Sequence, residues 1–256
     1  MRRRKKISIA IIVVIIIGIV AVVAGAMFMP TNNELSIGEK HILICALDES
    51  EARQGMGGCD MAFIVTLNNG SLVNYSAVYP GGLTHPTAEE PQEAQEMGAG
   101  EKLLMHDSFW YDDDEQSMQL AKEIVEYNFN VSIDAVVAVN TEAIDAVIQA
   151  ASPIEVNGQT LEVSGIDIIR EEQYGQGVTR GTAVLDLVQG IASSADDPLT
   201  KAKMVQAAMD QYAKGNIVMT PADEFMVYWL LKVYPVYLDN LSIFLIFLIF
   251  NSNNKF

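Results

Sequence analysis

Apolar residues are distributed very unevenly along this chain of 256 residues. An uncharged run rich in Ile and Val occupies positions 7–29, directly after basic residues at every position from 2 to 6. A bilayer core requires roughly 20 apolar residues in helical form, so this run is long enough to span a membrane. Basic residues beside a span favour the cytoplasmic side. We therefore predict a cytoplasmic tip at 1–6 and one transmembrane helix at 7–29.

A cleaved signal peptide is the competing interpretation of the same run. Ala24-Gly25-Ala26 fits a small-residue cleavage site. The apolar part of a signal peptide is typically only about 7–15 residues long, so we favour an uncleaved anchor. A polar linker at 30–39 would then lead to an extracellular domain at 40–231, held at the cell membrane by a single pass.

Strand-like and helix-like patterns are mixed between the linker and residue 231. Short apolar or alternating runs predict strands, and apolar positions three and four residues apart predict helices. Asn-Gly pairs at 69–70 and 157–158 are typical of β-hairpin turns. The predicted strands are 41–47, 61–67, 72–78, 135–139, 154–156 and 160–163, and the predicted helices are 112–127, 141–151, 179–192, 198–214 and one that begins at Thr220. This mixture predicts a layered α/β/α domain with a mixed central sheet.

A second apolar run lies near the end of the chain, at 241–250, and is too short to span a membrane as a helix. A buried final strand is one interpretation. We favour a frameshift near Val227, because codons able to encode 227–238 permit an ordinary domain ending when they are read two bases later. We therefore treat 232–256 as an apolar tail outside the domain.

Composition separates these apolar segments from the domain between them. Mean hydropathy is +0.20, although the net charge is −17. Of the 16 Lys and Arg, five lie at positions 2–6. The rest of the chain therefore has 11 Lys and Arg against 33 Asp and Glu, which is a net charge of −22. Such a charge excludes a general nucleic-acid binder. It also means that a phosphate ligand needs a local basic pocket or a divalent cation.

Two carboxylates flank the loop that follows the first predicted strand. Asp48 ends that strand and Asp60 begins the next one, so neighbouring strands would bring both to one edge of a sheet. Two carboxylates there could hold Mg²⁺ together with phosphate oxygens. A solvated turn, in which Asp caps backbone N–H groups, is the alternative. Cys45 and Cys59 flank the same loop, and the sequence leaves a disulfide and two buried thiols equally open.

Other candidate residues stand apart from this loop. His85 lies in a segment rich in Gly and Pro after the third predicted strand, as a loop residue that could contact a ligand. His106 and Asp107 are triad residue types, but adjacency in sequence is not triad geometry, and a chance run is the simpler interpretation. Arg170 follows an apolar stretch, and Arg180 stands where a helix is predicted to begin and could bind an anion. Ion pairs with the many carboxylates are the alternative role for both arginines.

The order of these pieces resembles the LytR-CpsA-Psr family of envelope glycopolymer transferases. Residues 42–48 resemble the family's first strand ending in Asp, and 57–63 resemble its Gly-Arg-Ser-Asp-Thr block, with Asp60 at the acid. Ile169-Arg170 is similar to the late Val-Arg motif, and Thr179-Arg180-Gly181 to the Arg-Gln motif that opens a helix. The similarity covers most of 41–231 at low identity, and we expect an archaeal branch of membrane-anchored domains.

The resemblance implies a fold and a function. Family members bind polyprenyl-pyrophosphate-linked glycans and transfer the glycan phosphate to an envelope acceptor. By this resemblance, Asp48 and Asp60 would carry Mg²⁺ or orient the acceptor hydroxyl, and Arg170 and Arg180 would bind phosphate, which suits a guanidinium fork. The chain departs from the family at Gly58, Gly81, Gly82, Glu172 and Gly181. A non-catalytic envelope domain that binds glycan or a protein partner is therefore the alternative function.

Overall fold

The computed structural model describes residues 34–51, 53–156, 159–161, 173–174, 178–179, 193–194 and 197–222. The predicted membrane span at 7–29, the tail at 232–256, Arg170 and Arg180 lie outside these residues. Among the helices of the described part, none is both long and apolar enough to cross a bilayer.

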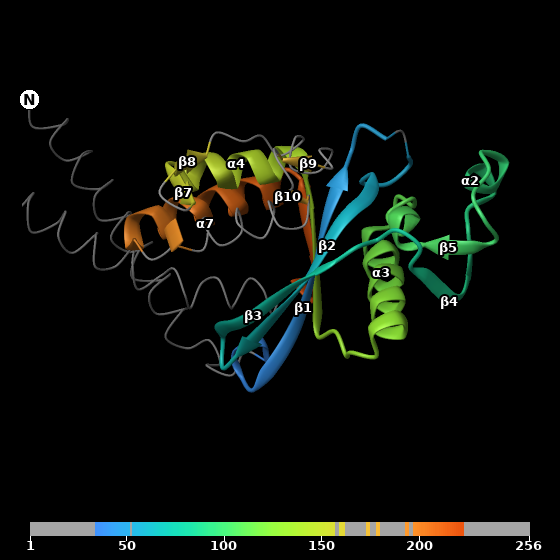
Figure 1. Ribbon diagram of the computed structural model, residues 1–256, viewed down its shortest axis with the longest axis horizontal. Helices are drawn as coiled ribbons and strands as arrows, with labels where there is room; N and C mark the ends of the chain where they lie inside the picture. Colours follow the sequence, from blue (N-terminus) through green and yellow to red (C-terminus); the bar gives the residue numbers. More distant parts are fainter. Residues whose placement is uncertain are drawn as a thin grey trace, which may run out of the picture. The chain divides into compact units, whose positions relative to one another are not determined.

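A mixed five-stranded sheet forms the centre of the domain, in the order β11-β6-β1-β2-β3 (Figure 1). Its strands are β1 (Glu39–Asp48), β2 (Gly58–Asn68), β3 (Ser71–Val78), β6 (Ala135–Asn140) and β11 (Ile217–Thr220). β1 and β6 run parallel, whereas the other pairings in this sheet are antiparallel. The predicted mixed central sheet is therefore confirmed.

Helices cover both faces of this sheet (Figure 1). α3 (Asp114–Phe129) packs on one face, and α4 (Thr141–Ala151) and α7 (Pro198–Ala213) pack on the other. Alternation along β1 explains the two cores, because successive side chains of a strand point to opposite faces. Leu43 and Cys45 pack with residues of α3, while Ile42 and Ala46 belong to the clusters on the other face. The layered α/β/α architecture follows from this alternation.

The remaining elements extend this framework. β4 (Thr84–Glu89) pairs with β5 (Lys102–Leu104), β7 (Ile154–Val156) with β8 (Gln159–Leu161), and β9 (Gln173–Tyr174) with β10 (Val178–Thr179). The short helices are α2 (Gln92–Glu96) and the 3₁₀ turns η1 (Glu34–Ser36) and η2 (Met105–Asp107). Both predicted hairpins are confirmed, and the turn between β2 and β3 places Asn69 at φ 49° and Gly70 at φ 72°.

The structure differs from the sequence-based prediction at several short elements. The segment expected as a loop around His85 becomes strand β4 from Thr84 onward, and β11 was not predicted. Strands of four to six residues contain too few positions to show a clear period. α3 begins at Asp114 and is capped by Asp113, whose Oδ1 accepts from the Gln116 N–H at 3.0 Å. Thr179, predicted to open a helix, belongs to β10, and 180–192 lie outside the described residues.

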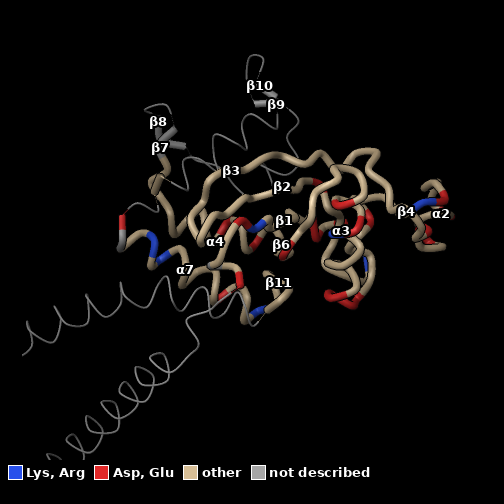
Figure 2. The backbone as a smooth tube through the Cα atoms, turned by 90° about the horizontal axis from the view of Figure 1, so that it is seen from below, with Lys and Arg blue, Asp and Glu red and all other residues tan. Residues whose placement is uncertain are grey.

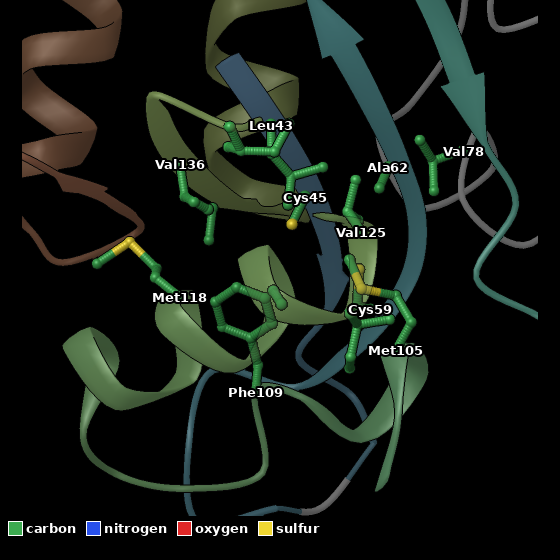
Figure 3. Packing of buried hydrophobic residues seen from close by; sticks show 14 of the residues in the cluster. Leu43, Cys45, Cys59, Ala62, Val78, Met105, Phe109, Met118, Val125 and Val136 are labelled. Carbon is green, nitrogen blue, oxygen red and sulfur yellow. The ribbon is translucent and has the colours of Figure 1, made fainter. Parts of the chain in front are cut away.

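The larger core anchors the segment after β5. Met105 and Phe109 are fully buried among residues of β1, β2 and α3 (Figure 3). The Met105 N–H also donates to the Leu83 carbonyl at 2.9 Å. Because these neighbours are fixed, the intervening residues of η2 are held at a defined place beside the beginning of β2.

Candidate functional site

The loop between β1 and β2 forms one side of the candidate site. Asp48 pairs with Gly58 across the two strands, and the register then shifts at Leu47, so that Asp60 lies beside this irregularity. Asp48 is only 2% exposed, and its Oδ1 accepts from the backbone N–H and the hydroxyl of Ser50, at 2.9 and 2.6 Å. Asp48 therefore shapes the turn after β1, which is the alternative role that its sequence context allowed.

Asp60 meets two side chains that the sequence does not place near it. His106 Nε2 lies 3.3 Å from Asp60 Oδ1 and 3.3 Å from Glu51 Oε2. One potential ligand atom from each of these three side chains lies within 4.8 Å of the other two. The side chains of Glu51, Asp60 and His106 are 39%, 21% and 34% exposed. We call these three residues the His106 cluster.

A buried ion-pair network supports the His106 cluster from behind. Arg53 is only 6% exposed, and its Nη2 lies 2.8 Å from Glu51 Oε2 and 2.7 Å from Asp107 Oδ1. Its Nη1 donates to the His106 carbonyl at 3.1 Å, and its guanidinium lies over the Trp110 ring, 5.3 Å from the ring centre. Two carboxylates and an aromatic face therefore hold the guanidinium in place.

Charges around the ring control the protonation of His106. Hydrogen bonds to Asp107 and Asp60 raise its pKa to about 10, against the opposing effects of burial and of the Arg53 charge. Burial alone would raise the pKa of Asp107, but the hydrogen bond with His106 and the Arg53 charge hold that pKa below its ordinary value. The imidazole is therefore a cation at neutral pH when its only neighbours are protein groups.

A buried carboxyl stands behind Asp107. Glu90 is 3% exposed, and its Oε1 accepts from the Leu104 N–H at 2.7 Å. Within the described part of the chain, no donor reaches its buried Oε2. Burial raises the pKa of Glu90 to about 7, the Leu104 N–H lowers it, and the charge and hydrogen bond of Asp107 raise it further. With a proton on Oε2, Glu90 can donate to Asp107, so these two carboxyls share a proton rather than both being ionised.

The backbone at Gly58 leaves the space that the cluster occupies. A Cβ at this position would lie 2.5 Å from Arg53 Nη1, 2.6 Å from Glu51 Oε2 and 3.0 Å from His106 Nε2. The family block that 57–63 resemble has Arg where this chain has Gly58. Here the guanidinium of Arg53 lies against that backbone instead.

The other predicted residues lie elsewhere. His85 is buried on β4, where Nδ1 accepts from the Thr87 and Ala88 N–H groups at 3.1 and 2.7 Å, and Nε2 lies 2.7 Å from Glu123 Oε2. Its ligand contact stays a prediction, as do the roles of Arg170 and Arg180, which lie outside the described residues. Cys45 and Cys59 are buried free thiols. Burial raises the pKa of Cys45, and the neighbouring Cys59 thiol raises it further.

Sequence reasoning missed most of this site. It selected Asp60 but not Glu51, Arg53 or Glu90, and it treated His106 and Asp107 as a chance run. One available signal was the scarcity of basic residues in an acidic chain, because Arg53 stands inside the loop between the two predicted carboxylates. Nothing in the sequence alone showed that a segment about fifty residues later returns to this loop.

Residues 38–174 match the protein family described as "Protein of unknown function (DUF4012)". The chain belongs to this family. The matched residues contain the whole His106 cluster, Arg53, Glu90 and Asp107, but not α7 or β11. No match is found among the curated proteins.

Solved structures share the fold at low sequence identity. Protein gbs0355 from Streptococcus agalactiae is 12% identical, with a TM-score of 0.50 over 75% of this chain and 73% of that chain. The transcriptional regulator yvhJ from Bacillus subtilis is 15% identical, with a TM-score of 0.49 over 77% of each chain. A structure described as TagT bound to LI-WTA is 13% identical, with a TM-score of 0.46 over 78% of this chain and 76% of that chain. These likenesses concern the fold alone.

Proposed function

We propose that this chain is a single-pass membrane protein whose extracellular domain binds a polyprenyl-pyrophosphate-linked glycan at the β1–β2 edge. Three observations support the proposal: the basic tip and apolar run at 1–29, the sequence motifs that resemble envelope transferases, and a fold of the expected kind. A membrane tether would keep the domain close to a donor that is itself anchored in the bilayer.

The observation that carries the proposal is the gathering of ionisable side chains around Asp60. A partly exposed carboxylate cluster can hold a divalent cation, and the cation can bind phosphate oxygens. This arrangement matters because acidic residues outnumber basic residues along the backbone (Figure 2). In such a domain, a cation and two arginines, Arg170 and Arg180, would offset the charge of the pyrophosphate.

Mg²⁺ is the cation that the sequence resemblance implies, and the fit of the residues is partial. The carboxylates of Asp60 and Glu51 are suitable oxygen donors, but Asp48 already accepts two hydrogen bonds from Ser50. When bound, a cation would stabilise negative charge at the phosphate. The protein groups would place the ligand, and Arg53 would fix the orientation of Glu51.

A second candidate function is an envelope domain that binds the same ligand without transferring it. The position of Arg53 favours this candidate. Its guanidinium is nearly buried and lies between Glu51 and Asp107, so it already has anionic partners and is poorly placed to stabilise a transferred phosphoryl group.

The test uses the full chain in mild detergent and a polyprenyl pyrophosphate as the probe. We expect binding that requires a divalent cation, is lost with EDTA, and falls at least tenfold in Asp60→Asn. Asp112→Asn, an exposed acid at the start of α3, is the matched control and should bind like the parent chain. Absence of binding by the parent chain would refute the proposal.

Transfer is measured separately, with a labelled lipid-linked glycan and isolated envelope as the acceptor. Label that becomes envelope-bound with the parent chain, but not with Asp60→Asn, would assign the transferase. Cation-dependent binding with no transfer would assign the non-catalytic domain.

A further inference from the structure

The His106 cluster contains a nitrogen donor as well as two carboxylate donors. Imidazole is a common ligand of first-row transition metals, whereas Mg²⁺ is bound almost entirely through oxygen. We propose that Glu51, Asp60 and His106 bind a divalent transition metal, with Zn²⁺ as its representative, in preference to Mg²⁺. The inference deepens the proposed function by naming the cation and its ligands, but it can be tested without any lipid.

The spacing of the donor atoms fits this assignment. Tetrahedral Zn²⁺ with bonds of about 2.0–2.2 Å places neighbouring ligand atoms about 3.4 Å apart. Octahedral Mg²⁺, with bonds of about 2.0–2.1 Å, requires about 2.9 Å between adjacent ligands. His106 Nε2 lies 3.3 Å from both Asp60 Oδ1 and Glu51 Oε2. Those separations are also longer than the usual charge-assisted hydrogen bond of about 2.7–2.9 Å.

The second nitrogen of the ring has the partner that metal-bound histidines usually have. Asp107 Oδ1 lies 3.3 Å from His106 Nδ1, and Asp107 is itself held by Arg53 at 2.7 Å. Arg53 Nη2 also lies 3.1 Å from Nδ1, so Nε2 is free of a proton and able to bind metal when Nδ1–H donates to Asp107 rather than accepting from Arg53. From the buried side outward, the site would therefore consist of the Asp107 carboxylate, the His106 imidazole and the metal.

The charges also balance when a divalent ion is present. Glu51, Asp60 and Asp107 contribute three negative charges and Arg53 one positive charge, which leaves −2 when the imidazole is neutral. A divalent cation brings this sum to zero.

Partial exposure of the three side chains gives the ion a route from solvent. Zinc sites with three protein ligands commonly keep a fourth position for water or for an oxygen of the ligand. Such a position would let the metal of this site reach a phosphate oxygen, as the proposed function requires.

The test is isothermal titration of the full, untagged chain in mild detergent after EDTA treatment, with Zn²⁺, Mn²⁺ and Mg²⁺ as separate probes. We expect one Zn²⁺ per chain, and weaker binding of Mg²⁺. Glu51→Gln and His106→Gln should each lower the affinity for Zn²⁺ at least tenfold. Asp107→Asn, which changes the support of the ring, should lower it about 10- to 100-fold.

His41→Gln is the matched control. Its Nε2 faces a single carboxylate, Glu39, at 3.7 Å, so losing this histidine should leave Zn²⁺ binding unchanged. Circular dichroism reports whether each variant is folded. If His106→Gln does not fold, Glu51→Gln, at the most exposed of the three positions, tests the Zn²⁺ site by itself.

Two results would overturn the inference. One is that the parent chain binds no Zn²⁺, or that Glu51→Gln binds Zn²⁺ as tightly as the parent chain does. The other is preference for Mg²⁺ with loss of binding in Asp48→Asn, which would return the cation to the Asp48–Asp60 pair. Zinc binding without lipid binding would refute only the proposed function, and lipid binding that depends on Mg²⁺ alone would refute only this inference.

Discussion

Two histidines, one on β4 and one just after β5, face carboxylates in very different surroundings. The ring of His85 is fixed by backbone groups, because Nδ1 accepts from two N–H groups and Nε2 donates to Glu123. The backbone of β4 therefore sets the partners of this ring at Nδ1. His85 therefore secures the fold of β4 against α3.

The ring of His106 is surrounded by side chains that carry charge. Asp60, Glu51 and Asp107 all approach its nitrogens, and Arg53 lies beside them. Because these charges belong to side chains, a bound cation or a substitution can change them. Backbone groups hold the second nitrogen of His85, whereas charged side chains surround both nitrogens of His106.

The largest expected effect separates the two rings by stability. His85→Ala removes the acceptor of two backbone N–H groups and the donor to Glu123, so we expect the free energy of unfolding to fall by about 3–4 kcal/mol. His106→Ala removes partly exposed ion pairs with Asp60 and Glu51 and one with the buried Asp107, and should cost less, about 1–2 kcal/mol. Urea unfolding followed by circular dichroism, in EDTA at pH 7, measures both. Equal losses in the two variants would contradict the distinction.

The next effect concerns the buried carboxyl behind Asp107. Burial raises the pKa of Glu90 from about 4.5 to about 7, so the folded domain holds this proton more tightly than the unfolded chain. Stability from this group is present at low pH and is lost as pH rises through about 7. Glu90→Gln keeps a neutral acceptor and donor in place, so it should stabilise the domain at pH 8 by up to about 3 kcal/mol, and very little near pH 4.5.

Urea unfolding at the two pH values measures this difference. Glu93→Gln, at an exposed position on the neighbouring helix α2, is the control and should change the free energy of unfolding by less than about 0.5 kcal/mol at either pH. A stabilisation by Glu90→Gln that is the same at pH 4.5 and pH 8 would show that the buried carboxyl does not titrate between them.

The two regions were also unequally accessible to sequence reasoning. Apolar runs predicted β1 and β6, runs joined by an Asn-Gly turn predicted β2 and β3, and apolar positions three and four residues apart predicted α3 and α4. Asp60 could be selected because it lies near the beginning of β2, after a loop rich in Gly. Glu90 and His106 could not, because their importance depends on η2 packing against β2, a contact between distant segments that leaves no local pattern. Asp48, a conspicuous acid at a strand end, accepts two hydrogen bonds from Ser50 in the turn after β1, and its role at a cation stays a prediction.

A smaller effect is expected on the pKa of His106 when its neighbour Asp107 is changed. Asp107→Asn removes the carboxylate whose hydrogen bond contributes most to the raised pKa of His106, so that pKa should fall from about 10 towards its ordinary value. Stability from His106 is present below its ordinary pKa and is lost as pH rises towards 10, so the variant should lose this stability at a lower pH. NMR titration of the His106 ring in EDTA measures the shift, and an unchanged titration would remove Asp107 as its main cause.

The smallest effect tests whether the two histidines are independent. Asp113 caps α3, the helix that carries Glu123, and Asp113→Ala should lower the free energy of unfolding by about 1 kcal/mol. Its exposed neighbour makes no such cap bond, so Asp112→Ala is the matched control and should cost clearly less. Because α3 holds the partner of His85 but none of the charges around His106, Asp113→Ala should leave the NMR titration of His106 unchanged. A shifted His106 titration in this variant would show that the two regions are coupled through the common core beneath them.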